Sequence, residues 1–414
     1  MTVRIATTGA AYSANKGAAS MLQALFDELP ARWGDVEIAV LSTYPEADTD
    51  ALRRAGRADA RAVSATPLEL VASHLPLAVM AAVLRRVGLP WAWLCRPPAL
   101  RAIRRADLVV DVSGISYSSS RRWRFTIYGA LVNLVPMLLG TPQVKASQAL
   151  GPFDDPVTRI LATTLLPRLD GVVARGEASV AHLEPLLPGR VVTADDLAFL
   201  MHLNPATKAR AAALLDGRSG LVGVAPSAVV DGLCAERGID YVGTLASFID
   251  GLPGDGPGVV LFAHSTSASP LPRRLDDVPV CRAIAARLER PERCLLLDQD
   301  LLPFELRAVI ERCSVLVTSR FHAMVSALAV GTPPLVVGWS HKYAEVLEQF
   351  GLESSMVDYA GLDGAELVRL YSTIADDEQA LRRRILEHLP AVRSSAERNL
   401  DEIGRVLALT EASA

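Results

Sequence analysis

The residues best suited to chemistry stand together within residues 315–351. Ser319, Arg320 and His322 fall within four positions, and Lys342 follows later in the same stretch. Guanidinium and ammonium groups bind anions, and an imidazole exchanges protons near neutral pH. A single Arg or His is more often a solvated charge or a structural residue. The concentration of three such groups favours an anion-binding site.

The surrounding sequence predicts the elements that position these groups. Residues 315–318 are a short β-branched run typical of a buried strand, and residues 321–330 have helix-forming composition closed by Gly331. A second apolar strand over residues 335–337 and a helix that Ser340 could cap come next. In a parallel sheet both strand-to-helix turns lie at the carboxyl edge, where helix amino ends bind anions.

The order and spacing of these pieces resemble the signature of the polysaccharide pyruvyl transferase family. The resemblance is carried by Ser319-Arg320-Phe321-His322-Ala323, Ala327-Leu328, Gly331-Thr332-Pro333 and Lys342-Tyr343. It implies an enzyme that moves the pyruvyl group of phosphoenolpyruvate onto saccharide hydroxyls, forms a ketal and releases phosphate. It also implies that Arg320, Ser319 and Lys342 bind the donor, with His322 as phosphate ligand or general acid.

The first strand-like segment, residues 3–7, leads into a loop over residues 13–18 that feeds a helix. Small residues there would let a ligand approach the backbone, and an ordinary tight turn explains them equally well. The family begins with an Asn-x-Gly segment at this place, so the resemblance assigns Asn15, Lys16 and Gly17 to substrate binding.

Two further strand ends carry polar residues. The strand over residues 108–112 leads to Ser113 and Gly114, which we expect to contact substrate. The strand over residues 143–146 precedes Gln148, part of a segment that resembles the family's Gln-x-x-Gly-Pro-Phe, and its amide could bond a sugar hydroxyl.

Two candidate catalytic residues follow strands in the same way. Arg175 matches a family position thought to bind phosphoenolpyruvate, and pairing with Glu177 is the structural alternative. His264 is a second candidate acid or base. Asp195 and Asp196 are adjacent carboxylates in a loop, which usually point apart, so we give them little weight as an acid/base pair.

Composition limits the number of domains and the kinds of partner and cofactor that the chain can have. The chain has 414 residues, of which 50% are hydrophobic and 21% charged, so two domains with large cores are expected and disorder is excluded. A net charge of -4 argues against nucleic acid as a partner. The five cysteines form no CxxC pair and the carboxylates no cluster, so we predict no metal, and no cofactor besides phosphoenolpyruvate as substrate.

The alternation of strands and helices predicts an α/β chain of two Rossmann-like domains facing across a cleft, and the resemblance implies the same GT-B-type architecture. We place an acceptor-side domain at residues 1–205 and a donor-side domain at residues 206–375. Residues 376–414 are expected to form a helix that packs back on the first domain.

Residues 75–95 are the most membrane-like stretch, but Arg85, Arg86 and two prolines interrupt it. We favour a buried or inter-domain helix pair. The alternative is a membrane-facing surface within residues 75–105, in which Trp91 and Trp93 accompany several arginines. Residues 1–10 lack the features of a secretory signal, so the expected setting is cytoplasmic, at the inner face of the membrane under the alternative.

Two rival functions remain open at this stage. A GT-B-type glycosyltransferase would use a similar cationic crevice for a nucleotide sugar, and a non-catalytic saccharide-binding protein would keep the fold alone. The acceptor could be a lipid-linked sugar, a nucleotide sugar or a small glycoside. For a pyruvyl transferase, we expect His322→Ala and Arg175→Ala to abolish turnover and leave the melting temperature near that of the parent.

Overall fold

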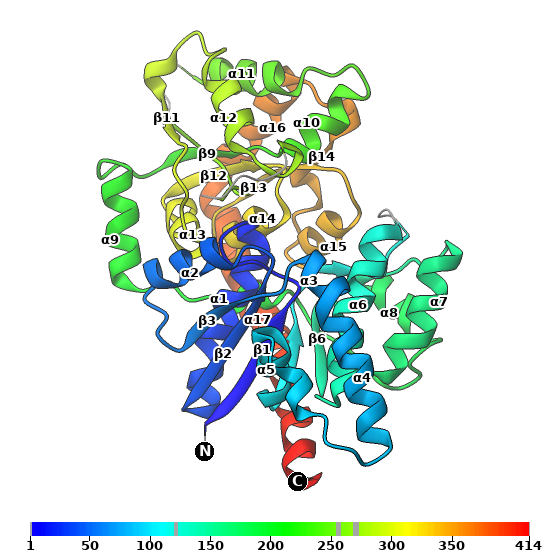
Figure 1. Cartoon of the computed structure of the whole chain (residues 1–414). Helices are drawn as coiled ribbons and strands as arrows, with labels where there is room; N and C mark the ends of the chain where they lie inside the picture. Colours follow the sequence, from blue (N-terminus) through cyan, green and yellow to red (C-terminus); the bar gives the residue numbers. More distant parts are fainter. Residues whose placement is uncertain (1, 120–122, 254–257, 268–272, 414) are drawn as a thin grey trace. The chain divides into compact units, whose positions relative to one another are not determined.

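The computed structural model describes residues 2–119, 123–253, 258–267 and 273–413 and contains two parallel sheets (Figure 1). The chain forms two compact units. The first comprises residues 1–12, 21–200 and 393–414, and the second comprises residues 13–20 and 201–392. The predicted α/β class with two Rossmann-like sheets is confirmed. The units differ from the predicted division at residues 13–20, which belong to the second unit, and at the end of the chain.

The first sheet consists of parallel strands in the order β3-β2-β1-β4-β6-β7-β8, with the short β5 paired to β6. In register, Ile5 of β1 lies between Ile38 of β2 and Leu108 of β4. The strand bounds are β1 Val3–Thr8, β2 Val36–Ser42, β3 Ala60–Ser64, β4 Leu108–Asp111, β5 Ile115–Ser116, β6 Gln143–Leu150, β7 Gly171–Ala174 and β8 Val191–Thr193.

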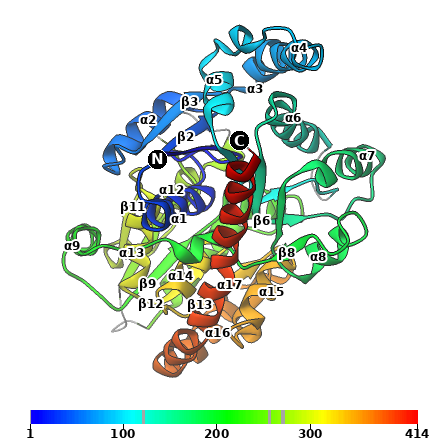
Figure 2. The ribbon, with the colours of Figure 1, turned by 90° about the horizontal axis from the view of Figure 1, so that it is seen from below.

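Helices cover this sheet because its strands are apolar on both faces. Ala6, Ala39 and Val109 face a core shared with Ala78 and Leu139 of two covering helices. Figure 2 shows these helices from below. Their bounds are α1 Lys16–Trp33, α2 Pro45–Arg54, α3 Pro67–Glu69, α4 Leu75–Arg86, α5 Pro98–Arg105, α6 Trp123–Leu139, α7 Pro156–Leu165 and α8 Glu177–Leu183.

The second sheet has the order β11-β10-β9-β12-β13-β14, all parallel. This is the 3-2-1-4-5-6 order of dinucleotide-binding folds. Val315 and Val317 of β12 pack into one core and Leu316 into the core on the other face, as expected for a strand buried on both sides. The bounds are β9 Leu221–Ala225, β10 Val259–Phe262, β11 Cys294–Leu297, β12 Cys313–Thr318, β13 Pro334–Gly338 and β14 Met356–Asp358.

The remaining helices are α9 Pro205–Leu214, α10 Ala228–Ala235, α11 Tyr241–Gly251, α12 Val278–Ala285, α13 Pro303–Glu311, α14 Phe321–Ala329, α15 Lys342–Glu348, α16 Gly364–Asp376 and α17 Glu378–Ser413. Side chains cap the amino ends of several of these helices. Asn204 accepts from the Thr207 amide at α9, and Asp363 accepts from the Glu366 amide at α16. In α17, residues from 393 onward belong to the first unit.

Two local predictions were wrong. Strand β6 continues to Leu150, so Gln148 lies within a strand rather than in a loop. The helical stretch Pro67–Arg86, made of α3, a π-helical turn at Leu70–His74 and α4, is not buried: only 22% of its most apolar window is covered. Among the described residues, this stretch is the one helix that is long and apolar enough to cross a membrane, judged by length and composition alone.

Candidate active site

In the second unit, strands β9 and β12 adjoin at the point where the strand order reverses, which is where open α/β sheets bind ligands. Strand β12 ends at Thr318 and α14 begins at Phe321, so the prediction that Ser319, Arg320 and His322 lie at a strand-to-helix turn is confirmed. The helix cap is Arg320 rather than Ser319, and the Ser319 hydroxyl instead bonds the Tyr241 hydroxyl at 2.7 Å.

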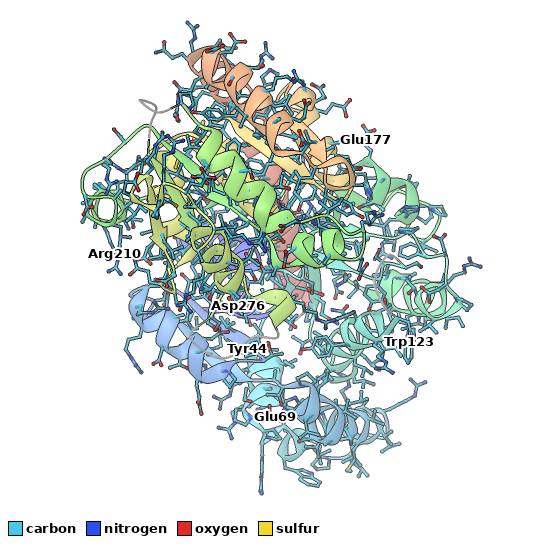
Figure 3. All side chains as sticks on the ribbon, turned by 90° about the horizontal axis from the view of Figure 1, so that it is seen from above. Tyr44, Glu69, Trp123, Glu177, Arg210 and Asp276 are labelled. Carbon is cyan, nitrogen blue, oxygen red and sulfur yellow. The ribbon has the colours of Figure 1, made fainter. Side chains whose placement is uncertain are left out.

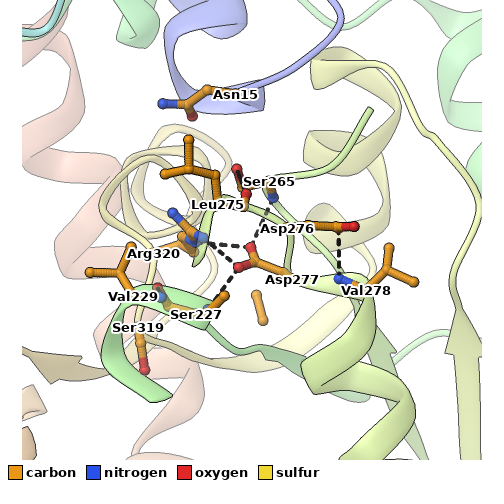
Figure 4. A network of polar contacts seen from close by, with 12 residues as sticks. Asn15, Ser227, Val229, Ser265, Leu275, Asp276, Asp277, Val278, Ser319 and Arg320 are labelled. Carbon is orange, nitrogen blue, oxygen red and sulfur yellow. Dashed lines mark hydrogen bonds and ion pairs between the residues drawn. The ribbon is translucent and has the colours of Figure 1, made fainter. Parts of the chain in front are cut away.

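Arg320 is held in a fixed orientation by a buried carboxylate (Figure 4). Its Nε donates to Asp277 at 2.8 Å, and its Nη2 donates to the other oxygen of the same carboxylate. Asp277 also accepts from the amides of Ala228 and Ser265, each at 2.9 Å. Burial lowers the pKa of the Arg320 guanidinium, but the Asp277 carboxylate more than offsets this and raises the pKa above its ordinary value. A ligand would therefore meet a permanent cation through Nη1.

The loop that opens α1 also belongs to this unit and touches the same residues. Asn15 forms an antiparallel bridge with Ser265, and its side chain accepts from the Gly17 amide at 3.1 Å. A methyl group on Gly17 would lie 2.7 Å from Cγ and 2.9 Å from Cβ of His322, with Nδ1 closer still. The absence of a side chain at Gly17 thus allows the imidazole to lie this close to the loop.

Lys16 is fully buried, and its ammonium donates to the Ser13 carbonyl at 2.6 Å and pairs with Asp300. The family resemblance assigns Lys16 to substrate binding. The observed contacts give it the role of fixing the loop, because a buried ammonium is stable only when it is paired and hydrogen-bonded.

His264 lies directly after β10 and is 2% exposed. Burial lowers the pKa of this imidazole well below its ordinary value, and the positive charges of His322, Arg320 and Lys16 lower it further. His264 is therefore neutral at physiological pH and can accept a proton or a hydrogen bond.

Lys342 begins α15 and has an aromatic environment. Its ammonium lies 5.0 Å from the ring centroid of Phe321, 4.9 Å from that of Trp339 and 5.4 Å from that of Tyr343. These cation–π contacts hold the ammonium against the turn. Tyr343 in turn donates to the Ser319 carbonyl at 3.0 Å, so Lys342 and Tyr343 fix the turn that carries Arg320. The predicted cap at Ser340 is not formed, and His341 is exposed at the start of α15.

The first unit holds a separate polar network around Asp111, at the end of β4. The carboxylate pairs with the buried Lys145 and accepts from Asn133 and Gln148, each at 3.0 Å. Burial raises the pKa of Asp111, but Lys145 and the hydrogen bonds lower it below its ordinary value, so the carboxyl is ionised. Gln148 is fully buried and also accepts from Ser116 at 2.6 Å. The oxygen and the nitrogen of its amide are thus both hydrogen-bonded within the unit. These bonds orient Asp111 and leave the amide no bond for a sugar hydroxyl.

Arg175 lies beside this network, at the end of β7. Its partner is Asp196 and not Glu177, and its other amino group donates to the Gly114 carbonyl at 3.1 Å. Ser113 donates to Asp111 through its amide at 3.0 Å and through its hydroxyl. Arg175 and Asp111 therefore shape the Ser113-Gly114 loop.

The predicted site residues are divided between the units. The second unit brings together Asn15, Lys16, Gly17, His264, Ser319, Arg320, His322 and Lys342, and the first brings together Ser113, Gly114, Gln148 and Arg175. The sequence reasoning missed the carboxylate partners Asp111, Asp196, Asp277 and Asp300. Strand-end position signals three of them, since Asp111 ends β4, Asp196 follows β8 and Asp300 follows β11. Across the described parts of the chain, no group of three or more His, Cys, Asp or Glu side chains could hold a metal ion.

Comparison with known proteins identifies the chain's relatives. The family model for polysaccharide pyruvyl transferase matches residues 15–341. The amylovoran biosynthesis protein AmsJ of Erwinia amylovora is 20% identical over 403 residues, covering 92% of this chain and 94% of AmsJ.

Solved structures share the fold at low identity. UDP-GlcNAc 2-epimerase from Neisseria meningitidis, bound to UDP-GlcNAc, matches with a TM-score of 0.60 and 13% identity over 98% of this chain and 99% of that one. The epimerase from Methanocaldococcus jannaschii matches with a TM-score of 0.53 and 12% identity over 91% and 93% of the two chains. These similarities show the GT-B-type fold. With the family model matching from the Asn15 loop through the turn that carries Arg320 and His322, the chain belongs to the polysaccharide pyruvyl transferase family.

Proposed function

We propose that this protein transfers the pyruvyl group of phosphoenolpyruvate to two hydroxyls of a saccharide or glycoside, forming a cyclic ketal and releasing phosphate. The observation that carries the proposal is the family match, whose residues include the group around Arg320, His322 and His264. A donor with a carboxylate and a phosphate suits a turn that offers a permanent guanidinium beside the amino end of α14.

The reaction needs one proton donor and one proton acceptor. Protonation of C3 of phosphoenolpyruvate makes C2 electrophilic, and an acceptor hydroxyl then attacks C2 and loses its proton. A second hydroxyl displaces phosphate from the same carbon, and phosphate leaves with the C2–O bond pair. One proton enters at C3, and the two hydroxyl protons leave to a base and to phosphate.

The environments of the two histidines suggest their roles. His264 is neutral before the donor binds, because burial and neighbouring cations lower its pKa, so we assign it to accept the proton of the attacking hydroxyl. His322 lies at the first turn of α14 and receives the role of general acid and phosphate ligand. Arg320 binds the donor, while Lys16 and Lys342 hold the surrounding turns.

In the first unit, we assign the Ser113-Gly114 loop to acceptor binding. Arg175 acts through this loop, since its guanidinium is buried and bonds the Gly114 carbonyl and Asp196. This makes Arg175 a positioning residue and not a donor ligand. The acceptor is a saccharide, free or attached to a nucleotide or lipid.

A titration of thermal stability separates this function from its rivals. A ligand of the native state stabilises it by about 2.7 kcal/mol at a hundred times its dissociation constant. We expect stabilisation by phosphoenolpyruvate, and phosphate release when an acceptor is supplied. The matched variant is Arg320→Lys, which keeps a cation beside Asp277 and removes the guanidinium. It should fold and lose the response.

Stabilisation by UDP- or GDP-sugars without any response to phosphoenolpyruvate would contradict the proposal and favour glycosyl transfer. Binding of phosphoenolpyruvate without phosphate release in any acceptor mixture would favour a non-catalytic protein.

A further inference from the structure

Large apolar side chains are exposed on one part of the first unit. Among the described residues, 12 of the 15 exposed large hydrophobic side chains fall between residues 68 and 160. They are Leu68, Val71, Val79, Met80, Val83, Val87, Leu89, Trp93, Trp123, Phe125, Val157 and Ile160. Such a concentration is unusual on a protein surface and indicates a partner that covers it.

The helices that carry these side chains are neighbours. α4 packs against α6, and α6 packs against α7, so the three lie side by side in both ribbon views (Figures 1 and 2). At the α6–α7 contact, the Thr126 and Thr158 hydroxyls lie 3.3 Å apart. In Figure 3, Glu69 marks the end of α3 and Trp123 marks the beginning of α6. We call the exposed face of α3, α4, α6 and α7 the apolar surface.

The helix formed by residues 67–86 is apolar on two opposite faces. Leu70, Ala78 and Ala81 lie in the core of the unit. Val71, Val79 and Val83 recur at helical spacing and are 57%, 45% and 56% exposed. An ordinary amphipathic helix presents polar residues on its outer face. Because the inner face is packed in the core, the helix lies along a partner and does not cross a bilayer.

The charges near the apolar surface are mostly positive. The one acidic residue within its four helices, Glu69 at the end of α3, is partly buried and accepts from Ser64 and Thr66, and Asp154 and Asp155 precede α7. Residues 70–106 contain no Asp or Glu and six arginines, Arg85, Arg86, Arg96, Arg101, Arg104 and Arg105, all of them exposed. None of the six pairs with a carboxylate in the part of the chain that the structure describes. α6 and α7 add Arg124 and Arg159 and have no acidic residue.

We propose that the apolar surface binds a membrane that contains anionic lipids, with α3 and α4 lying in the headgroup region. Exposed Val and Leu side chains enter the boundary of the acyl chains, Trp93 and Trp123 suit the interface, and the arginines pair with lipid phosphates. A second copy of the chain fits less well, because a two-fold contact would place the same arginines against each other. This inference does not depend on the identity of the donor.

The test is sedimentation of the full chain with phospholipid vesicles. We expect the protein to bind vesicles of phosphatidylcholine with 30% phosphatidylglycerol, to bind pure phosphatidylcholine more weakly, and to be released by salt. Val79→Glu combined with Val83→Glu should lower the partition coefficient roughly tenfold or more. Leu409→Glu, at an equally exposed apolar position on α17, should leave it unchanged.

A second variant keeps the test decisive if the double Glu variant folds poorly. Arg101→Ala, Arg104→Ala and Arg105→Ala together should weaken binding to anionic vesicles, by roughly fivefold for each arginine. Failure of the parent to sediment with anionic vesicles, or equal sedimentation of parent and variants, would overturn the proposal. So would a parent dimer that Val79→Glu and Val83→Glu convert to a monomer without any effect on vesicles.

Discussion

A methyl group at Gly17 tests whether His322 must keep its position. To reach an ordinary contact distance of 3.4 Å from a Cβ built on Gly17, Cγ of His322 has to move by about 0.7 Å. Such overpacking costs about 1–3 kcal/mol, while an alanine in a helix gains about 1 kcal/mol over glycine. The net change in stability for Gly17→Ala should therefore be small.

The effect on donor binding should be larger. If His322 bonds the donor phosphate, displacing its ring forfeits a charge-assisted hydrogen bond of about 1.5–3 kcal/mol, which is roughly a 10- to 100-fold rise in the dissociation constant. Isothermal titration calorimetry with phosphoenolpyruvate measures this without an acceptor. The control is Gly232→Ala in α10, where an added Cβ meets nothing within 4 Å. It should stabilise the fold by about 0.5–1 kcal/mol and leave binding intact.

A double-mutant cycle identifies the cause. His322→Gly removes Nδ1, Cγ and Cβ from the crowded contact, so Gly17→Ala should have little further effect on binding in that background. A folded Gly17→Ala protein that binds phosphoenolpyruvate as tightly as its parent would refute the role given to His322. If Gly17→Ala lowered the affinity for phosphoenolpyruvate equally with and without the His322 side chain, the effect would come from the loop over residues 13–18 instead.

Three further outcomes follow from buried charges. Anionic phosphoenolpyruvate should offset the cations that lower the His264 pKa, so its binding in mildly acidic buffer should be accompanied by proton uptake. Calorimetry in buffers of different ionisation enthalpy detects this uptake. Identical binding heats in all buffers would contradict it. His264 protonates more readily in the unfolded chain, so its contribution to the free energy of unfolding should fall as the pH drops below about 6.5, by about 1.4 kcal/mol per pH unit. His264→Asn should flatten this slope, with His74, whose pKa burial also lowers, supplying the remainder. Arg175→Ala should lose roughly 3 kcal/mol in urea unfolding, because it leaves the Asp196 carboxylate uncompensated, and adding Asp196→Ala should recover much of the loss.

That last expectation revises the one drawn from sequence, which held that Arg175→Ala would barely affect stability. Sequence patterns report local structure well, and residues 315–330 show why. The continuous β-branched run of β12 and the apolar, helix-forming composition of α14 are encoded in neighbouring residues, so the turn carrying Arg320 could be predicted. The partner of Arg320 could not, because Asp277 is 43 residues away and meets it only through the order of the strands.

The same reason applies to Lys16. Its partner Asp300 is 284 residues away, and nothing in the run from Ser13 to Gly17 indicates whether the ammonium faces a ligand or a carboxylate. The expectation that residues 67–86 are buried was wrong for a different reason. Their composition was taken as a sign of burial, yet apolar residues occupy both the inner and outer faces of the helix. Composition measures how apolar a segment is and not what covers it.

The buried carboxylates carry a consequence for recognition. Arg320 pairs with Asp277, Lys16 with Asp300, Lys145 with Asp111 and Arg175 with Asp196. Four cations near the carboxyl ends of the strands are thus neutralised before any ligand binds, so the local potential is far weaker than the sequence suggests. An anion would then be selected by the direction of a fixed donor, the Arg320 Nη1 group, rather than by net charge. Fixed donors cost little reorganisation when charge develops, which favours a site that performs chemistry over one that only attracts anions.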